Sequence, residues 1–110
     1  MNHSQKTADQ AQMFVNRLQK RLRHLKKRVV RAGAGVFRLY DRDIPEIPLV
    51  LDYYGDVSLP REAALCGALY KRPYEKDESD EEKWLSAMKD AACAALGIDS
   101  ERVFIKQRQR

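Results

Sequence analysis

Apolar side chains recur along the N-terminal third of the chain with the spacing of one helix face. They lie four, four, three and four residues apart, at Phe14, Leu18, Leu22, Leu25 and Val29. This period predicts an amphipathic α-helix. The stretch Thr7-Ala8-Asp9-Gln10 has the form of a capping box, in which Thr7 would begin the helix. We expect the helix to run to about Ala32, where Gly33 would end it as the first residue beyond the helix.

After Gly33 the pattern changes to that of strands. Val36–Tyr40 and Leu49–Tyr54 are rich in β-branched and aromatic residues, and a loop with two prolines separates them. Gly55-Asp56 has the composition of a two-residue hairpin turn. It predicts a third strand that begins over residues 57–59, which Pro60 would interrupt or confine to an edge.

The C-terminal half predicts one more helix and a last strand. Residues 63–70 are short and apolar, and we favour a strand over Leu65–Tyr70, because the chain then returns beside the strand that begins at Leu49. An acidic linker follows, and Ser79-Asp80-Glu81-Glu82 reads as a second capping box, for a helix that runs to Leu96 and ends at Gly97. Trp84, Leu85, Met88, Ala91, Ala92 and Ala95 would face inward. Arg102–Arg108 reads as the final strand.

The order of elements, α-β-β-β-α-β, predicts an α+β fold. We expect a basic N-terminal helix, then a small, mainly antiparallel sheet with one packed helix. The chain has 110 residues, enough for one domain. We expect residues 1–9 to be a disordered, linker or added segment and residues 10–110 to be one subdomain, cut before a further domain.

Charge is distributed unevenly along the chain. The net charge is +5, yet residues 17–31 alone hold eight Lys or Arg and no acid, while residues 75–90 hold seven acids against three lysines. Such asymmetry suggests a polyanionic partner at one end. No apolar run approaches the roughly 20 residues of a membrane span, and no secretory signal opens the chain. We therefore expect no membrane partner and a cytoplasmic location.

Other candidate chemistry is weak. Gly33-Ala34-Gly35 lies between a helix and a strand, the reverse of a dinucleotide-binding loop, so we interpret it as a helix stop. The acids around Arg42 fit a solvated loop with a local Arg–Asp pair better than a cation site. His3 and His24, like Cys66 and Cys93, are spaced for neither a metal nor a disulfide, so we expect no metal site. Neither cysteine has a local activating feature.

The acid-free basic helix is the strongest functional signal. Exposed helices usually mix charges of both signs, whereas this stretch favours phosphate contacts. The predicted RNA-binding residues are Arg17, Lys20, Arg21, Arg23, Lys27, Arg28 and Arg31, extended by Lys106, Arg108 and Arg110. The alternatives are a solvated face, a face docked on the chain's own acidic region at 75–82, and a helix on a membrane surface. The five tyrosines could stack on bases, although most such tyrosines close the edge of a core.

Three stretches carry a family resemblance. They are MFVNRLQKRLRHLKK at 13–27, RLYDRDIPE at 38–46 continuing to DYYGD at 52–56, and VFIKQR at 103–108. In this order they resemble the segment that precedes the second methyltransferase domain of the bacterial bifunctional 23S rRNA guanine methyltransferases. That family methylates guanine at N2 with one half and at N7 with the other, using S-adenosylmethionine. Residues 59–64 depart from the family pattern as an insertion.

The resemblance implies a role without catalytic chemistry in these residues. The family's S-adenosylmethionine-binding loop and catalytic motif lie beyond this stretch, so no catalytic residue can be assigned here and no cofactor is expected in this chain. The hypothesis is an RNA-binding accessory subdomain that positions 23S rRNA for the catalytic domain of the same parent protein. The alternative is a packing or dimerisation module that binds no RNA, whose basic helix docks on the catalytic domain or a partner.

Overall fold

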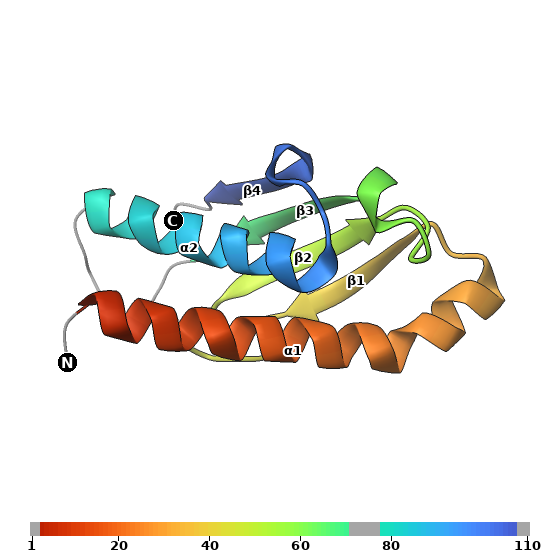
Figure 1. Cartoon of the computed structure of the whole chain (residues 1–110), viewed down its shortest axis with the longest axis horizontal. Helices are drawn as coiled ribbons and strands as arrows, with labels where there is room; N and C mark the ends of the chain where they lie inside the picture. Colours follow the sequence, from red (N-terminus) through yellow and green to blue (C-terminus); the bar gives the residue numbers. More distant parts are fainter. Residues whose placement is uncertain (1–2, 71–77, 108–110) are drawn as a thin grey trace.

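The computed structural model describes residues 3–70 and 78–107, and it confirms the α+β class. Its elements follow the predicted order (Figure 1). In chain order they are α1 (His3–Ala32), β1 (Val36–Asp41), β2 (Leu49–Tyr54), the 3-10 turn η1 (Pro60–Glu62), β3 (Ala64–Leu69), α2 (Glu78–Leu96), the 3-10 turn η2 (Ser100–Arg102) and β4 (Val103–Gln107).

The four strands form one sheet in the order β1-β2-β3-β4. The first three strands pair antiparallel, and β4 pairs parallel to β3. A parallel pair needs a long connection, and here that connection contains α2. Both helices lie on the same side of the sheet and run in the same direction along it (Figure 1). The other side of the sheet is covered by neither helix.

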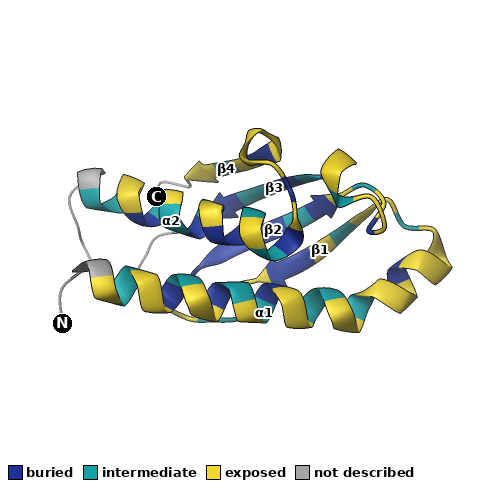
Figure 2. Cartoon of the chain, viewed as in Figure 1, coloured by how far each residue is buried: buried dark blue, intermediate teal, exposed yellow. Residues whose placement is uncertain are grey.

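The core lies between the two helices and the sheet (Figure 2). Phe14 and Leu18 of α1 and Met88 of α2 are fully buried against Leu51 and its neighbours on the sheet. Burial of each such side chain contributes about 1.5–3 kcal/mol relative to exposure. Phe14 also meets the ring of Tyr40 edge-on, with 5.0 Å between the ring centroids. The apolar stripe of the N-terminal helix therefore packs as its spacing predicts.

The predicted start of the first helix is wrong. The helix begins at His3, so Thr7 is an internal residue and not a cap. A capping box needs the Gln10 side chain to turn back to the start of the helix. Instead Gln10 is buried, and its Oε1 accepts a 2.7 Å hydrogen bond from Nε1 of Trp84 on α2. Residues 3–9 are thus helical, while the boundary of the folding unit at residue 10 stays a prediction.

The strand expected directly after Gly55-Asp56 does not form. Asp56 Oδ1 accepts hydrogen bonds from both the backbone N and the Oγ of Ser58, and Leu59 N donates to Asp56 O. These bonds fold residues 56–59 into a turn, and Pro60 then begins η1. Val57 still packs into the core. The strand favoured over Leu65–Tyr70 is confirmed as β3, which pairs with β2 in the expected antiparallel sense.

The helix ends were predicted more accurately than the helix starts. Gly33 has φ +65°, its N donates to Val30 O, and Ala34 N donates to Val29 O, the bonds of a Schellman motif. Gly97 has φ +70°, and the following Ile98 is buried as expected. The second helix begins at Glu78, so Ser79 lies inside it and not before it. Tyr74 and Arg108 fall outside the described residues.

Candidate nucleic-acid interface

Five of the seven cations predicted on the N-terminal helix project into solvent. They are Lys20, Arg23, Lys27, Arg28 and Arg31. Four of them, Lys20, Arg23, Lys27 and Arg31, follow one another at intervals of three and four residues, which places them along one stripe of the helix. The stripe is about 16 Å long, given the rise of 1.5 Å per residue. Lys26 and His24 are exposed beside it.

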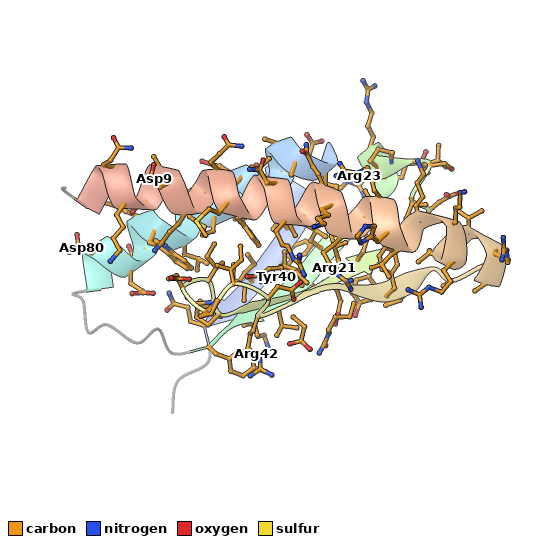
Figure 3. The ribbon with its side chains drawn as sticks, turned by 90° about the horizontal axis from the view of Figure 1, so that it is seen from below. Asp9, Arg21, Arg23, Tyr40, Arg42 and Asp80 are labelled. Carbon is orange, nitrogen blue, oxygen red and sulfur yellow. The ribbon has the colours of Figure 1, made fainter. Side chains whose placement is uncertain are left out.

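The other two helix cations turn toward the protein. Arg17 Nε donates to Asp43 Oδ2 at 2.9 Å. Arg21 Nε donates to the carbonyl of Leu39 at 3.1 Å and lies 3.8 Å from the same carboxylate oxygen. Figure 3 shows Arg21 on the side of α1 that faces Tyr40, and Arg23 on the opposite side. Arg17 and Arg21 therefore hold the β1–β2 loop against the helix.

The same loop is organised by a buried tyrosine. Tyr40 is fully buried; its hydroxyl donates to Ile47 O at 2.8 Å and accepts from Ile44 N at 3.0 Å. Burial of the ring raises the pKa of Tyr40 to about 12, because the charged phenolate is disfavoured away from water. The predicted local pair is present as well, with Arg42 Nε 3.3 Å from Asp41 Oδ1. Tyr40 thus closes the core and is not available to stack on a base.

The structure does not bring the C-terminal cations onto the helix stripe. Lys106 is exposed on β4 and pairs with Ala68. Its neighbour Ile105 packs against the core, and successive side chains of a strand point to opposite faces. Lys106 therefore points to the sheet face that the helices leave uncovered. Arg108 and Arg110 lie outside the described residues.

The basic stripe does not dock on the described acids of α2. Both helices start at the same end of the molecule (Figure 1), and the Trp84–Gln10 hydrogen bond fixes the start of α2 beside the first turns of α1. Figure 3 places Asp80 near that end, by Asp9. Asp80, Glu81 and Glu82 are thus separated from the basic stripe along the helix axis. Residues 75–77 of this acidic region fall outside the described part of the chain.

The uncovered face of the sheet carries exposed apolar side chains that the sequence pattern did not single out. Val36 and Tyr54 pair across β1 and β2 and are 52% and 42% exposed. Phe104 on β4 is 57% exposed, and it pairs with the half-buried Cys66. Arg38 and Asp52 form a two-pronged ion pair on the same face, at 2.8 and 3.1 Å. The cross-strand neighbours of these side chains depend on the strand register.

The structure also shows the surroundings of the cysteines and of the two glycines that follow α1. No group of three His, Cys, Asp or Glu among the described residues could hold a metal ion. Cys66 and Cys93 are free thiols, and burial raises the pKa of Cys93, which disfavours its reactive thiolate. Gly33 and Gly35 follow the C-terminus of α1, whereas nucleotide-type cofactors take a glycine loop that leads into a helix N-terminus. These glycines do not fit an S-adenosylmethionine cradle.

Neither helix is long and apolar enough to cross a membrane, over the residues that the structure describes.

Comparisons with known proteins point to one kind of enzyme. No protein-family model matches the chain. A ribosomal RNA large subunit methyltransferase K/L of Dichelobacter nodosus is 34% identical over 103 residues, which cover 94% of this chain and 13% of the relative. The protein of the same name from Pseudomonas syringae pv. tomato is 41% identical over 102 residues, 90% of this chain and 12% of the relative.

A shorter relative carries the matching segment too. The ribosomal RNA large subunit methyltransferase K of Neisseria meningitidis serogroup B is 34% identical over 97 residues, 88% of this chain and 25% of the relative. The chain therefore spans between about an eighth and a quarter of the length of these curated relatives. Over about nine-tenths of its length it is homologous to a segment of the ribosomal RNA large subunit methyltransferases K/L, which confirms the family resemblance drawn from the three sequence stretches.

Proposed function

We propose that this chain is an RNA-binding accessory part of an rRNA methyltransferase, which positions 23S rRNA for a catalytic domain of the same parent protein. The observation that carries the proposal is the stripe of exposed cations on α1, which has no acid between residues 17 and 31. The names of the relatives supply the kind of substrate and reaction. S-adenosylmethionine would bind to the catalytic domain, and a cytoplasmic location goes with an rRNA substrate.

The physical basis is neutralisation of phosphates by several cations that no described ion pair engages. Lysine and arginine side chains on phosphates release condensed counterions, so affinity falls linearly with salt on a logarithmic scale. The five exposed cations among those predicted to bind RNA give a slope of roughly −3.5 to −4.5 if each meets one phosphate. Arg17 and Arg21 add less than their charge suggests, because Asp43 already neutralises part of it.

The test is titration of the chain with a short 23S rRNA hairpin at several salt concentrations. We expect micromolar binding with a slope near the predicted value. The variant Arg23→Glu/Lys27→Glu/Arg31→Glu should lose binding and flatten the salt dependence, because it replaces three phosphate contacts by repulsion. A matched control, Arg61→Glu/Lys83→Glu/Lys89→Glu, changes the net charge equally but alters η1 and α2 and leaves α1 intact. Equal losses in both variants would contradict a role for this particular face.

A second candidate function rests on a different surface. The exposed side chains of Val36, Tyr54 and Phe104 on the uncovered sheet face favour a packing module that binds the catalytic domain or a second copy, since they offer apolar area for a contact. The contact would then use the sheet and not the basic helix. Absence of RNA binding even at low salt would favour this alternative.

A further inference from the structure

A groove lies where α1 ends and the chain turns into β1. Its volume is about 350 Å³, within the range of small-molecule pockets. Buried Val29 and Val57 contribute to its apolar lining, together with Ala34. The remaining walls come from Val30, Gly33, Gly35, Gly55 and Asp56. At the three glycines the lining is bare backbone, so a planar group can approach the main chain closely there.

The groove adjoins a hollow that is lined by cations at the end of the basic stripe. This second, shallower hollow is lined by Lys26, Lys27 and Arg31 and shares Val30 with the groove. Val30 is 60% exposed and lines both hollows, so its side chain is accessible from each of them. An apolar slot with positive charge at its mouth is complementary to a nucleotide, whose base is flat and apolar on its faces and whose phosphate is anionic.

One fixed hydrogen-bond acceptor lines this slot. Asp56 Oδ1 accepts from Ser58 N at 2.9 Å and from Ser58 Oγ at 2.7 Å, while Oδ2 takes no part in these bonds. The two bonds orient the carboxylate, and they lower the pKa of Asp56, so it stays ionised at neutral pH. The carboxylate therefore accepts hydrogen bonds from a ligand and donates none.

We infer that this groove receives one unpaired guanine of the bound RNA, with its base against Val29, Val57 and Ala34, its Watson–Crick edge on Asp56, and its phosphate near Lys27 and Arg31. The inference rests on the proposed RNA-binding function and adds to it a site for a single base. Lys27 and Arg31 belong to the basic stripe and line the neighbouring hollow, which places the groove beside the end of the phosphate track.

Guanine follows from the chemistry of a lone carboxylate. Of the four bases, guanine alone presents two adjacent donors, N1–H and the N2 amino group, on its Watson–Crick edge. Adenine and cytosine place a ring-nitrogen acceptor beside their amino donor, and uracil flanks its one N–H with two carbonyl oxygens. Each of these would set an acceptor against the carboxylate, which accepts only. Unpaired bases are read on this edge when an RNA loop splays them out.

The test compares short oligouridines that differ at one central position. The wild-type chain should bind the oligomer with central guanine at least about fivefold more tightly than those with central uracil, adenine or cytosine. Gly35→Val fills the groove, and its new Cβ has no atom within 4 Å, so the fold should tolerate it. Asp56→Asn keeps an oxygen for Ser58 but removes the charge. Both variants should lose the guanine preference and keep wild-type affinity for the all-uridine oligomer.

The outcomes separate the groove from the function on which it rests. Salt-dependent binding of all four oligomers with equal affinity would overturn the guanine site and leave the RNA-binding function standing. A guanine preference that survives both substitutions would also overturn it, because the base would then sit elsewhere. Binding of no oligomer and no rRNA hairpin would overturn the proposed function itself. If Gly35→Val fails to fold, the guanine preference of Asp56→Asn alone decides whether the groove is the guanine site.

Discussion

The ion pairs of Asp43 should stabilise the fold more than an exposed pair of similar geometry. Asp43 is bound by Arg17 at 2.9 Å, with Arg21 also near its carboxylate. Arg38 and Asp52 provide a comparison at 2.8 Å. The distances match, but the Asp43 side chain is only 16% exposed and the Asp52 side chain 27%, and the arginines are 38% and 53% exposed. The pairs therefore differ mainly in their access to water.

The expected magnitudes follow from this difference. A charge-assisted hydrogen bond that is partly removed from water contributes about 1.5–3 kcal/mol, whereas an exposed ion pair contributes roughly 0.2–1 kcal/mol. The Arg38–Asp52 pair has the better two-pronged contact, so geometry alone would favour it. We expect burial to outweigh geometry, with a coupling free energy of about 1.5 kcal/mol for Arg17–Asp43 and about 0.5 kcal/mol for Arg38–Asp52.

The assay is a pair of double-mutant cycles measured by urea denaturation. One cycle uses Arg17→Ala, Asp43→Ala and the double variant, and the other uses Arg38→Ala, Asp52→Ala and their double variant. Added salt should reduce the coupling of the exposed pair more than that of Asp43, because buried pairs are screened less. A coupling for Arg17–Asp43 no larger than that for Arg38–Asp52 would refute the argument that the loop is held by this contact.

Two further predictions concern the core. The pKa of Tyr40 is raised from 10.0 to about 12, so the folded state holds the phenol proton more tightly than the unfolded state. The resulting contribution to the free energy of unfolding is intact below about pH 10. It is lost as the pH rises toward 12, by up to about 2–3 kcal/mol. Urea unfolding in alkaline buffers should show this loss in the wild type and a much smaller one in Tyr40→Phe, and parallel curves would contradict the assignment. Gly67→Ala should destabilise by on the order of 3 kcal/mol, because the new Cβ would overlap Val50 O and lie 2.7 Å from Leu51 Cδ2. Gly35→Ala, with open space at its Cβ, is the control, and similar melting temperatures for the two variants would exclude the steric argument.

Local sequence patterns predicted most of the helices and strands, because these elements depend largely on residues that are close together in the chain. Helical spacing identified the buried face of α1 through Phe14 and Leu18, and β-rich runs identified β1 and β2 closely. The predicted capping box at the start of α1 was wrong, because the Gln10 side chain accepts a hydrogen bond from Trp84, which lies 74 residues away in the chain. A capping box is defined by residues three positions apart, so it contains no information about a contact between two helices.

The candidate site was predicted only in outline, for the same reason. Composition identified the basic helix, but it could not show that Arg17 and Arg21 face Asp43 while Arg23 and Lys27 face solvent. That division depends on how the β1–β2 loop folds back, and Tyr40 determines this through bonds to the loop backbone. The groove at the end of α1 joins residues 29–35 to residues 55–57, so no single stretch of sequence contains it.

The parallel pairing of β4 has a consequence for solubility. β3 reads Ala-Leu-Cys-Gly-Ala-Leu, an uncharged segment of six residues, and only β4 separates it from the edge of the sheet. Leu65 pairs with Val103, 38 positions later in the chain, whereas Tyr54 pairs with Ala64 only ten positions away. The late-arriving strand carries Lys106, a charge that discourages pairing with other chains. A chain truncated before Val103 should therefore expose β3 as a bare edge and aggregate, which light scattering would detect.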